Sequence, residues 1–266
     1  MIRERRPPDE LRICPDCSHH RSPANRSKRV LAVWWREDGR QNTYCHHCGE
    51  RRSLGKKANG KPRKSFQRPK DNSSAARRLW QQSLAPQDTP VERYLWDVRG
   101  LHIPIPPTIR YLPANGSMPH AMISGYGLVE EEEPGLLQTP TSVAAVHRTF
   151  LLPDGAGKHD LNKRMLGPVS GKPIVLAPPN DGLGIVITEG IEDALSIHAA
   201  TGLGAWAAGS AGQMPKLAEV VPRYVEHVLV VADADEVGQR NGRALTEALL
   251  TLNFVAKLKT LGVADG

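Results

Sequence analysis

The sequence has no long apolar run. None of its hydrophobic stretches approaches the roughly 20 residues that a membrane-spanning helix requires. The N-terminus, Met1-Ile2-Arg3-Glu4-Arg5-Arg6-Pro7, also lacks the apolar segment of a secretion signal. These two absences predict a cytoplasmic protein that has no membrane partner.

Cysteine is scarce, and all four residues lie near the N-terminus in two Cys-x-x-Cys pairs, Cys14/Cys17 and Cys45/Cys48. In a reducing compartment this usage favours a metal site over disulfides. Four thiolates on two tight turns satisfy the closed tetrahedral coordination of structural zinc. We therefore predict a zinc ion held by these four cysteines.

Between the two pairs, residues 29–36 and 41–44 read as two strands joined by a turn at 37–40. Residues 1–52 are therefore expected to form a β zinc ribbon. Since four thiols already fill a zinc site, we expect the nearby histidines to lie on the surface. These histidines are His19, His20, His46 and His47.

The net charge of +7 is uneven, because residues 1–75 contain 19 Lys and Arg residues against 8 Asp and Glu residues. A basic head before a mildly acidic body suggests a polyanion bound by the head and metal chemistry in the body. A merely solubilising terminus is the alternative. The residues expected to bind single-stranded nucleic acid through phosphate neutralisation and stacking are Arg29, Trp34, Trp35 and Arg36. The alternative for the tryptophans is the small core of the ribbon.

Residues 53–74 are rich in Lys, Arg, Gly, Pro and Ser and predict a basic flexible linker. Residues 75–180 follow as a small mixed α+β domain. The helices are expected at 75–84 and from Thr89-Pro90 onward, and the strands at 108–112, 122–129 and 142–152. This domain also contains three cations, Lys158, Lys163 and Arg164. We expect them either to bind phosphates in front of an acidic site in the C-terminal part of the chain or to be surface charges.

From residue 181 to residue 266 short apolar runs alternate with helical patterns, which predicts a doubly wound parallel sheet and an α/β class for the chain. The expected strands are 184–188, 203–206, 227–232 and 254–258. Glu189, Asp233 and Asp235 directly follow two of these strands. Because parallel strands end at one edge of a sheet, the three carboxylates are expected to converge on a divalent metal such as Mg²⁺. Helix capping is the alternative for Asp233, and interaction with the helix dipole is the alternative for Asp193.

These residues resemble the TOPRIM domain. The matching motifs are Glu189-Gly190 with Asp193, the turn Gly209-Ser210-Ala211-Gly212, and Asp233-x-Asp235 followed by Gly238. A zinc ribbon ahead of such a domain resembles the bacterial and phage-type DNA primase family, most closely primase-like proteins of phages, plasmids and mobile elements. Further motifs of that family are expected at Arg99-Gly100-Leu101, at 147–151 and at 163–167.

The resemblance implies DNA replication activity, namely synthesis of short primers on a single-stranded DNA template from nucleoside triphosphates. It implies Mg²⁺ or Mn²⁺ on Asp233 and Asp235, with Glu189 as a further ligand or acid/base group. It also implies nucleic-acid contacts by Arg148, Lys163 and Arg164, and a replicative helicase as a partner. Family members often carry a further acidic motif where this sequence stops. The resemblance therefore implies either a truncation near Asp265 or a compact version.

Three other functions fit the same motifs. A RecR-like DNA-binding mediator also combines a cysteine zinc site with a TOPRIM domain, although its helix-hairpin-helix signature is missing here. A primase-like scaffold without synthesis would only bind DNA. A TOPRIM nuclease would use the same carboxylates for cleavage.

Overall fold

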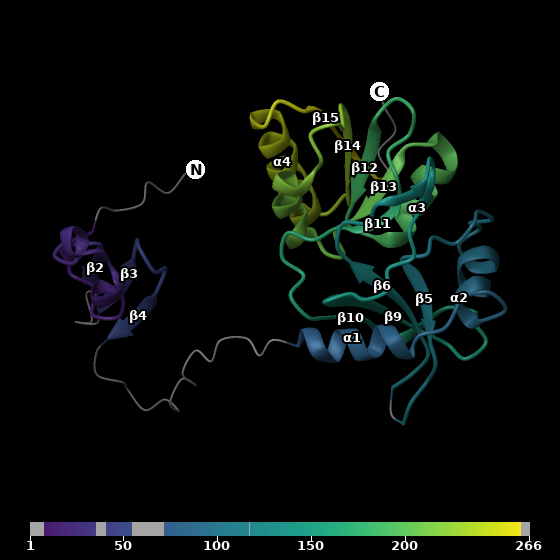
Figure 1. Cartoon of the computed structure of the whole chain (residues 1–266), viewed down its shortest axis with the longest axis horizontal. Helices are drawn as coiled ribbons and strands as arrows, with labels where there is room; N and C mark the ends of the chain where they lie inside the picture. Colours follow the sequence, from purple (N-terminus) through teal and green to yellow (C-terminus); the bar gives the residue numbers. More distant parts are fainter. Residues whose placement is uncertain (1–7, 36–40, 55–71, 117, 262–266) are drawn as a thin grey trace. The chain divides into compact units, whose positions relative to one another are not determined.

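The computed structural model describes residues 8–35, 41–54, 72–116 and 118–261. The chain divides into two compact units, Met1–Arg68 and Pro69–Gly266 (Figure 1). The elements of the first unit are β1 (Glu10–Arg12), η1 (Ser18–His20), η2 (Pro23–Asn25), β2 (Leu31–Trp35), β3 (Gln41–Cys45) and β4 (Arg51–Leu54). In the described part of the chain, no helix combines the length and apolar character needed to cross a bilayer.

The first unit is an antiparallel sheet in the order β1-β2-β3-β4. β2 pairs with β3 from Leu31 opposite Cys45 to Trp35 opposite Gln41, which confirms the two predicted strands. Arg36 and the predicted turn at 37–40 lie outside the described residues, as do residues 55–71 of the predicted linker.

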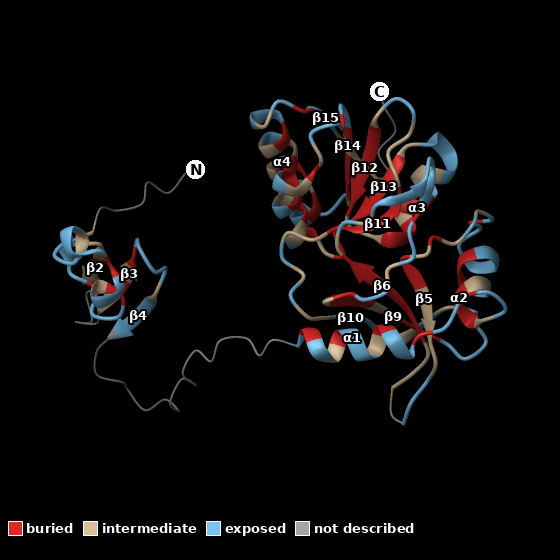
Figure 2. Ribbon diagram, in the orientation of Figure 1, coloured by how far each residue is buried: buried red, intermediate tan, exposed pale blue. Residues whose placement is uncertain are grey.

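The second unit contains two main sheets and the two-stranded sheet β7-β8. Its elements are α1 (Ser73–Gln82), α2 (Pro90–Arg93), η3 (Tyr94–Val98), β5 (Ile109–Leu112), β6 (Ala121–Tyr126), β7 (Glu131–Glu133), β8 (Leu136–Leu137), β9 (Ala145–Leu151), β10 (Lys158–Leu166), β11 (Ile174–Ala177), β12 (Gly184–Thr188), α3 (Ile191–Thr201), β13 (Gly204–Ala207), η4 (Ala211–Val220), β14 (His227–Ala232), α4 (Glu236–Thr251) and β15 (Val255–Thr260). Figure 2 shows strands of both sheets as the buried part of this unit.

The smaller main sheet is antiparallel, in the order β10-β9-β6-β5, so the strand predicted at 108–112 is an edge strand as expected. One face carries α1, whose Ala76 and Trp80 pack against Ile123 and Val146. The other face contributes Met122 and other residues to the large core beneath the second sheet. β10 was not predicted, because its sequence is mostly polar.

The larger sheet has the order β11-β13-β12-β14-β15. β12, β13, β14 and β15 are parallel. The apolar residues of the central strands β12 and β14 are largely buried, as parallel strands covered on both faces require, whereas the edge strand β15 begins at the exposed Val255. The sheet is nevertheless mixed rather than wholly parallel, since β11 runs antiparallel to β13. α3 packs on one face, while η4 and α4 pack on the other. η4 is a 3₁₀ helix where an α-helix was expected, and Pro215 inside it removes a backbone donor.

Candidate active site

The edge of the larger sheet places two predicted carboxylates in one cleft. β12 and β14 pair in parallel with Thr188 opposite Val231, so Glu189 and Asp233 leave their strands at the same edge. The Gly209 amide donates to the Glu189 carbonyl oxygen over 2.9 Å, which extends the pairing of β12 with β13 to this residue. Both side chains line a cleft of about 190 Å³.

We call this space the acidic cleft. Its walls come from the edge of the larger sheet, from the start of α3, from β9 and β10 of the smaller sheet, and from the residue after η3. The lining residues are Arg99, His147, Thr149, Lys158, Lys163, Glu189, Gly190, Ile191, Glu192, Asp193, Gly209 and Asp233. The cleft therefore brings four carboxylates opposite three cations.

Two of the cations pair with carboxylates across the cleft. Lys163 Nζ lies 3.5 Å from Glu189 Oε1. Lys158 Nζ lies 2.8 Å from Glu192 Oε1, and the Tyr94 hydroxyl donates to the same oxygen over 2.8 Å. Burial raises the pKa of Glu192, but the bonds from Lys158 and Tyr94 outweigh it and hold that pKa below its usual value. Glu192 is therefore an ionised, fully engaged carboxylate.

Asp193 has the opposite electrostatic setting. Burial raises its pKa, and the charges of Asp233 and Glu192 raise it further. The positive charges near Asp193 and Asp233 therefore do not balance the negative charges of these two carboxylates. A divalent cation beside Asp193 and Asp233 would relieve that repulsion, and hard oxygen ligands are what Mg²⁺ prefers. The donor set therefore fits the predicted metal.

Asp235 lies apart from the cleft lining. It is exposed and serves as the N-cap of α4, accepting from the Gly238 amide over 2.6 Å. Within the described residues, only the four cysteines bring three or more ligand atoms within 4.8 Å of one another. The role of Asp235 in metal binding, like that of Glu189 and Asp233, stays a prediction.

The floor of the acidic cleft contains a buried histidine. Burial lowers the pKa of His147 to about 4, and Lys163 adds to this effect, so the ring is neutral at physiological pH. Gly209, with φ +77°, passes close to both His147 and the Tyr126 hydroxyl. That hydroxyl is buried, and among the described residues it has no hydrogen-bond partner.

The three basic residues of the second unit that were predicted to contact nucleic acid separate onto two faces. Lys163 is opposite Thr149 and reaches the acidic cleft. Arg148 and Arg164 are opposite each other, and directly opposed residues share a face of a sheet. Their strand neighbours Thr149 and Lys163 point the other way, so the two arginines lie on the α1 face.

The four cysteine sulfurs form a compact cluster, which confirms their predicted grouping. The Sγ atoms of Cys17 and Cys45 are 3.7 Å apart, and those of Cys14 and Cys48 are 3.9 Å apart. A tetrahedron with Zn–S bonds of about 2.3 Å has edges of about 3.8 Å, so the cluster fits zinc. Burial opposes ionisation of Cys45, yet amides that point at its sulfur lower its pKa to about 7.

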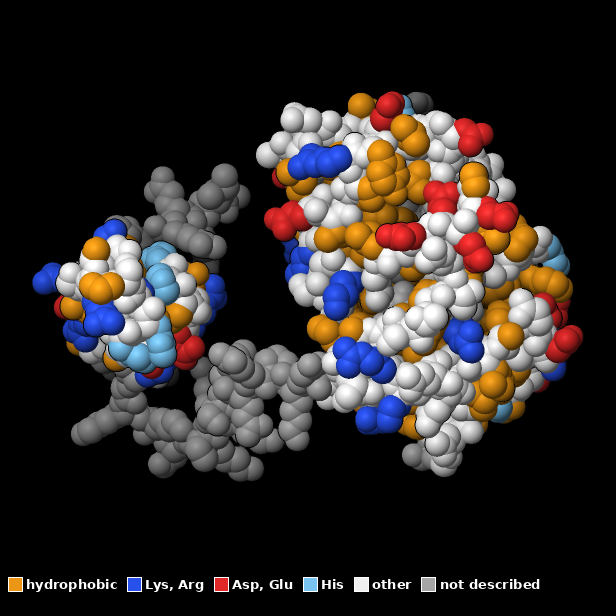
Figure 3. All heavy atoms as spheres, viewed as in Figure 1, with side chains coloured by type: hydrophobic (Ala, Val, Ile, Leu, Met, Phe, Trp, Pro, Cys, Tyr) orange, Lys and Arg blue, Asp and Glu red, His pale blue; other side chains and the backbone are white. Residues whose placement is uncertain are grey.

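The histidines near the cluster, His19, His20, His46 and His47, are exposed as expected. Figure 3 shows histidine side chains gathered on the visible face of this unit. Trp34 is half-buried, whereas Trp35 is 44% exposed and Arg29 is exposed. One tryptophan and one arginine are thus available to a ligand, and Arg36 lies outside the described residues.

Sequence reasoning missed Glu192 as a site residue and included His147 only as part of an expected family motif. It expected Lys158 either to meet phosphates in front of the acidic site or to be a surface charge. The position of Glu192, directly before the noted Asp193, was an available signal. No local pattern predicted the ion pair of Lys158 with Glu192, because the two residues lie on different elements and are brought together only by packing.

Two families match parts of the chain. Residues 70–176 match a domain of unknown function, DUF7146, and residues 184–261 match the Toprim domain. No curated protein matches the sequence.

The solved structures that match the chain include two from primases. The primase fragment of the bacteriophage T7 primase-helicase protein is 15% identical with a TM-score of 0.43, and the match covers 96% of this chain and 92% of that one. A DNA primase domain from Pseudomonas aeruginosa is 12% identical with a TM-score of 0.36, and the match covers 58% of this chain and 49% of that one. The chain thus contains a Toprim domain at residues 184–261, preceded by an N-terminal four-cysteine cluster.

Proposed function

We propose that this chain is a DNA primase or primase-like enzyme that synthesises short primers on single-stranded DNA by metal-dependent nucleotidyl transfer. The observation that carries the proposal is the acidic cleft, where carboxylates of a Toprim domain face Arg99, Lys158 and Lys163. Carboxylates suit a divalent metal, and the opposing cations suit the phosphates of a nucleoside triphosphate. A site of this kind can catalyse the transfer of a phosphoryl group to a hydroxyl, because it positions the two groups and stabilises the charge that develops between them.

The metal would be held by Glu189 and Asp233, with Asp193 beside them and Asp235 available if the start of α4 rearranges. Bound Mg²⁺ or Mn²⁺ would supply charge neutralisation at phosphate oxygens and activation of an attacking hydroxyl. Lys163 would orient phosphates from the opposite wall. His147, being neutral and buried, can accept a proton or a hydrogen bond without adding charge.

The first unit would hold template. Zinc on the four cysteines would fix the β2–β3 sheet, which presents the exposed Trp35 for stacking on a base. Arg29 would neutralise a phosphate nearby. A replicative helicase is a further proposed partner, and the cytoplasm is the proposed location.

Incubation of the full chain with single-stranded DNA, nucleoside triphosphates and Mn²⁺ tests the proposal. We expect template-dependent oligonucleotides. Asp233→Ala should lower synthesis by at least about 100-fold, as loss of one group that stabilises developing charge commonly does. DNA binding should persist. Glu247→Ala, an exposed change on α4, is the matched control and should retain synthesis.

The other outcomes separate the alternatives. Shortened template would support a nuclease. Binding without synthesis or cleavage would support a RecR-like mediator or a primase-like scaffold. Full synthesis by Asp233→Ala would overturn the site assignment even if the chain proved to be a primase.

A further inference from the structure

A row of arginines crosses the α1 face of the smaller sheet, away from the acidic cleft. The register of the sheet places four residues in one row across its strands: Arg110 of β5, Ile123 of β6, Arg148 of β9 and Arg164 of β10. The three arginines therefore point from one face. Figure 3 shows further Lys or Arg side chains over α1, whose Arg77 is exposed.

Among the three arginines of the row, only Arg110 makes side-chain hydrogen bonds to other described residues. Arg110 donates to the Ser83 hydroxyl over 2.7 Å and to the Ser83 carbonyl over 2.6 Å, and it also stacks on Trp80. Arg148 stacks on Phe150, but its buried Nε has no partner among the described residues. Arg164 is exposed and likewise has no bonded partner there.

The pairing of Arg148 with Arg164 is unfavourable without a ligand. Like charges directly opposite each other across two strands destabilise a sheet. A buried guanidinium N–H that lacks an acceptor adds a desolvation cost. Both costs would disappear if an anion with several acceptor oxygens lay between the two guanidinium groups.

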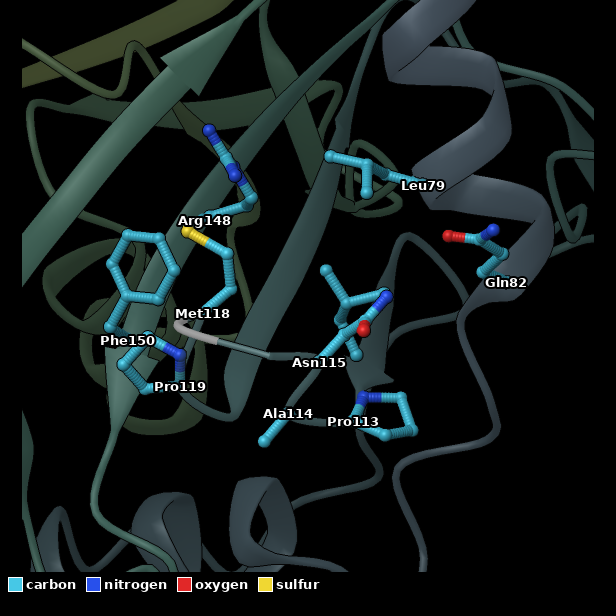
Figure 4. Close-up of a pocket in the computed structure, with 10 residues that line it drawn as sticks. Leu79, Gln82, Pro113, Ala114, Asn115, Met118, Pro119, Arg148 and Phe150 are labelled. Carbon is cyan, nitrogen blue, oxygen red and sulfur yellow. The ribbon is translucent and has the colours of Figure 1, made fainter.

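A pocket of about 290 Å³ opens beside Arg148. Its wall includes Phe150 of β9, Gln82 of α1, and Asn115 and Met118 of the connection between β5 and β6. Figure 4 shows Gln82 on the helix at one side and Arg148 and Phe150 on the strand at the other. None of the residues that line the pocket is acidic.

The composition of this pocket indicates the class of ligand. Its volume lies near the lower end for small-molecule sites, about 300 to 1,000 Å³, so it suits one small group rather than a helix. Apolar walls suit a flat ring, and the amides of Gln82 and Asn115 can both donate to and accept from a base edge. Arg148 lines the pocket and Arg164 lies opposite it on β10, and such a pair of guanidinium groups suits a phosphate.

We propose that this pocket, together with Arg148 and Arg164, is a second nucleotide site, which takes the base of a nucleoside phosphate and holds its phosphate on the two guanidinium groups. The site lies on the opposite face of the sheet from the acidic cleft and needs none of the cleft residues. Its ligand is either a free nucleotide or one nucleotide of a DNA strand.

Methyl NMR on the full chain labelled with [¹³C]methyl-methionine gives a local readout, because the chain has only 5 methionines and Met118 lines the pocket. The Met118 signal is assigned with Met118→Leu. AMP and, separately, a short oligothymidylate are titrated without added divalent ions. We expect a saturable shift of the Met118 signal with at least one of them. A shift with AMP identifies free nucleotide as a ligand, and a shift with the oligonucleotide alone identifies a DNA strand.

Arg148→Gln and Arg164→Gln should each weaken the titration about 10-fold, the effect of losing charge-assisted hydrogen bonds. Arg243→Gln removes the same charge on α4 and should leave the midpoint unchanged. The signal of buried Met122 verifies that each variant is folded. The proposal is overturned if neither ligand shifts the Met118 signal, or if both arginine variants keep the midpoint of the parent protein.

Discussion

The four carboxylates of the acidic cleft have different neighbours, and this difference assigns them different tasks. Glu192 is bound by Lys158 and Tyr94. Asp193 is half-buried near Asp233 and has no comparable partner among the described residues, so its ionised form is disfavoured. The bonds to Glu192 stabilise the native protein. The repulsion between Asp193 and Asp233 destabilises it, and a bound cation can relieve that repulsion.

Glu192→Gln should destabilise the second unit. Because the pKa of Glu192 is lowered in the folded state, the ionised side chain adds stability at pH values above its unfolded pKa. This contribution is lost as the pH falls through its folded pKa. The cost should be about 1 to 3 kcal/mol at neutral pH, because Lys158 loses its charged acceptor, and it should shrink in acid. Lys158 is 40% exposed, which keeps the cost toward the lower end.

Denaturant unfolding at several pH values measures the loss of stability caused by Glu192→Gln. Glu219→Gln, an exposed control, should change stability by less than about 0.5 kcal/mol. An equal effect at acid and neutral pH would contradict the ion-pair account.

Asp193→Asn should stabilise the metal-free protein. With a raised folded pKa, the native state binds more protons than the unfolded state between the two pKa values, so stability falls as the pH rises through that interval. The asparagine variant lacks this loss and should unfold at a higher temperature at pH values above that interval, and the gain should disappear in acid. Thermal unfolding with and without Mg²⁺ measures both effects, and Mg²⁺ should stabilise the parent protein more than the variant. A variant that Mg²⁺ stabilises as much as the parent would remove Asp193 from the proposed metal site.

At the scale of elements, the sequence predicted those with a local signature. β12 and β14 are apolar runs that end at carboxylates, and Thr89-Pro90 supplies both the cap and the first residue of α2. β10 lacks such a signal, because its sequence is mostly polar and only pairing with β9 makes it a strand. β11 is a short apolar run that was not predicted as a strand, and its antiparallel pairing with β13 follows from tertiary packing. The same limit applies to the site. Glu189 and Asp233 follow from strand ends, whereas the burial of Glu192 follows from tertiary packing. The capping role of Asp235 is local, since Asp235 accepts from the amide of Gly238 three residues on, but the same carboxylate also fits the pattern of a metal ligand.

The turn at Gly209–Gly212 supplies a matched pair of glycines. Gly209 has φ +77°, and a Cβ there would overlap the Tyr126 hydroxyl. Gly212 has an ordinary φ and open space around its Cβ position. Gly209→Ala should therefore destabilise the protein by about 2 kcal/mol or more, while Gly212→Ala should change stability by less than about 1 kcal/mol. Denaturant midpoints compare the two variants, and similar costs at both positions would show that the close approach at Gly209 is unimportant.

At the scale of the whole molecule, the two units have different sources of stability. The second unit contains three apolar clusters. In the described part of the first unit, the buried apolar residues are Ala32, Val33 and three of the four cysteines. So small a core cannot offset the entropy of folding by itself, so the metal should supply the difference.

Removal of zinc with a chelator should therefore unfold the first unit and leave the second one folded. Amide hydrogen exchange measures this directly: protection in β2 and β3 should be lost, while β12 and β14 keep theirs. Cys45→Ser should have the same effect as the chelator. His46→Ser alters an exposed neighbour and should keep β2 and β3 protected. Retained protection after chelation would mean that the cluster does not need its metal to fold. Lost protection in the His46 variant would mean that a histidine replaces one of the thiols as a ligand.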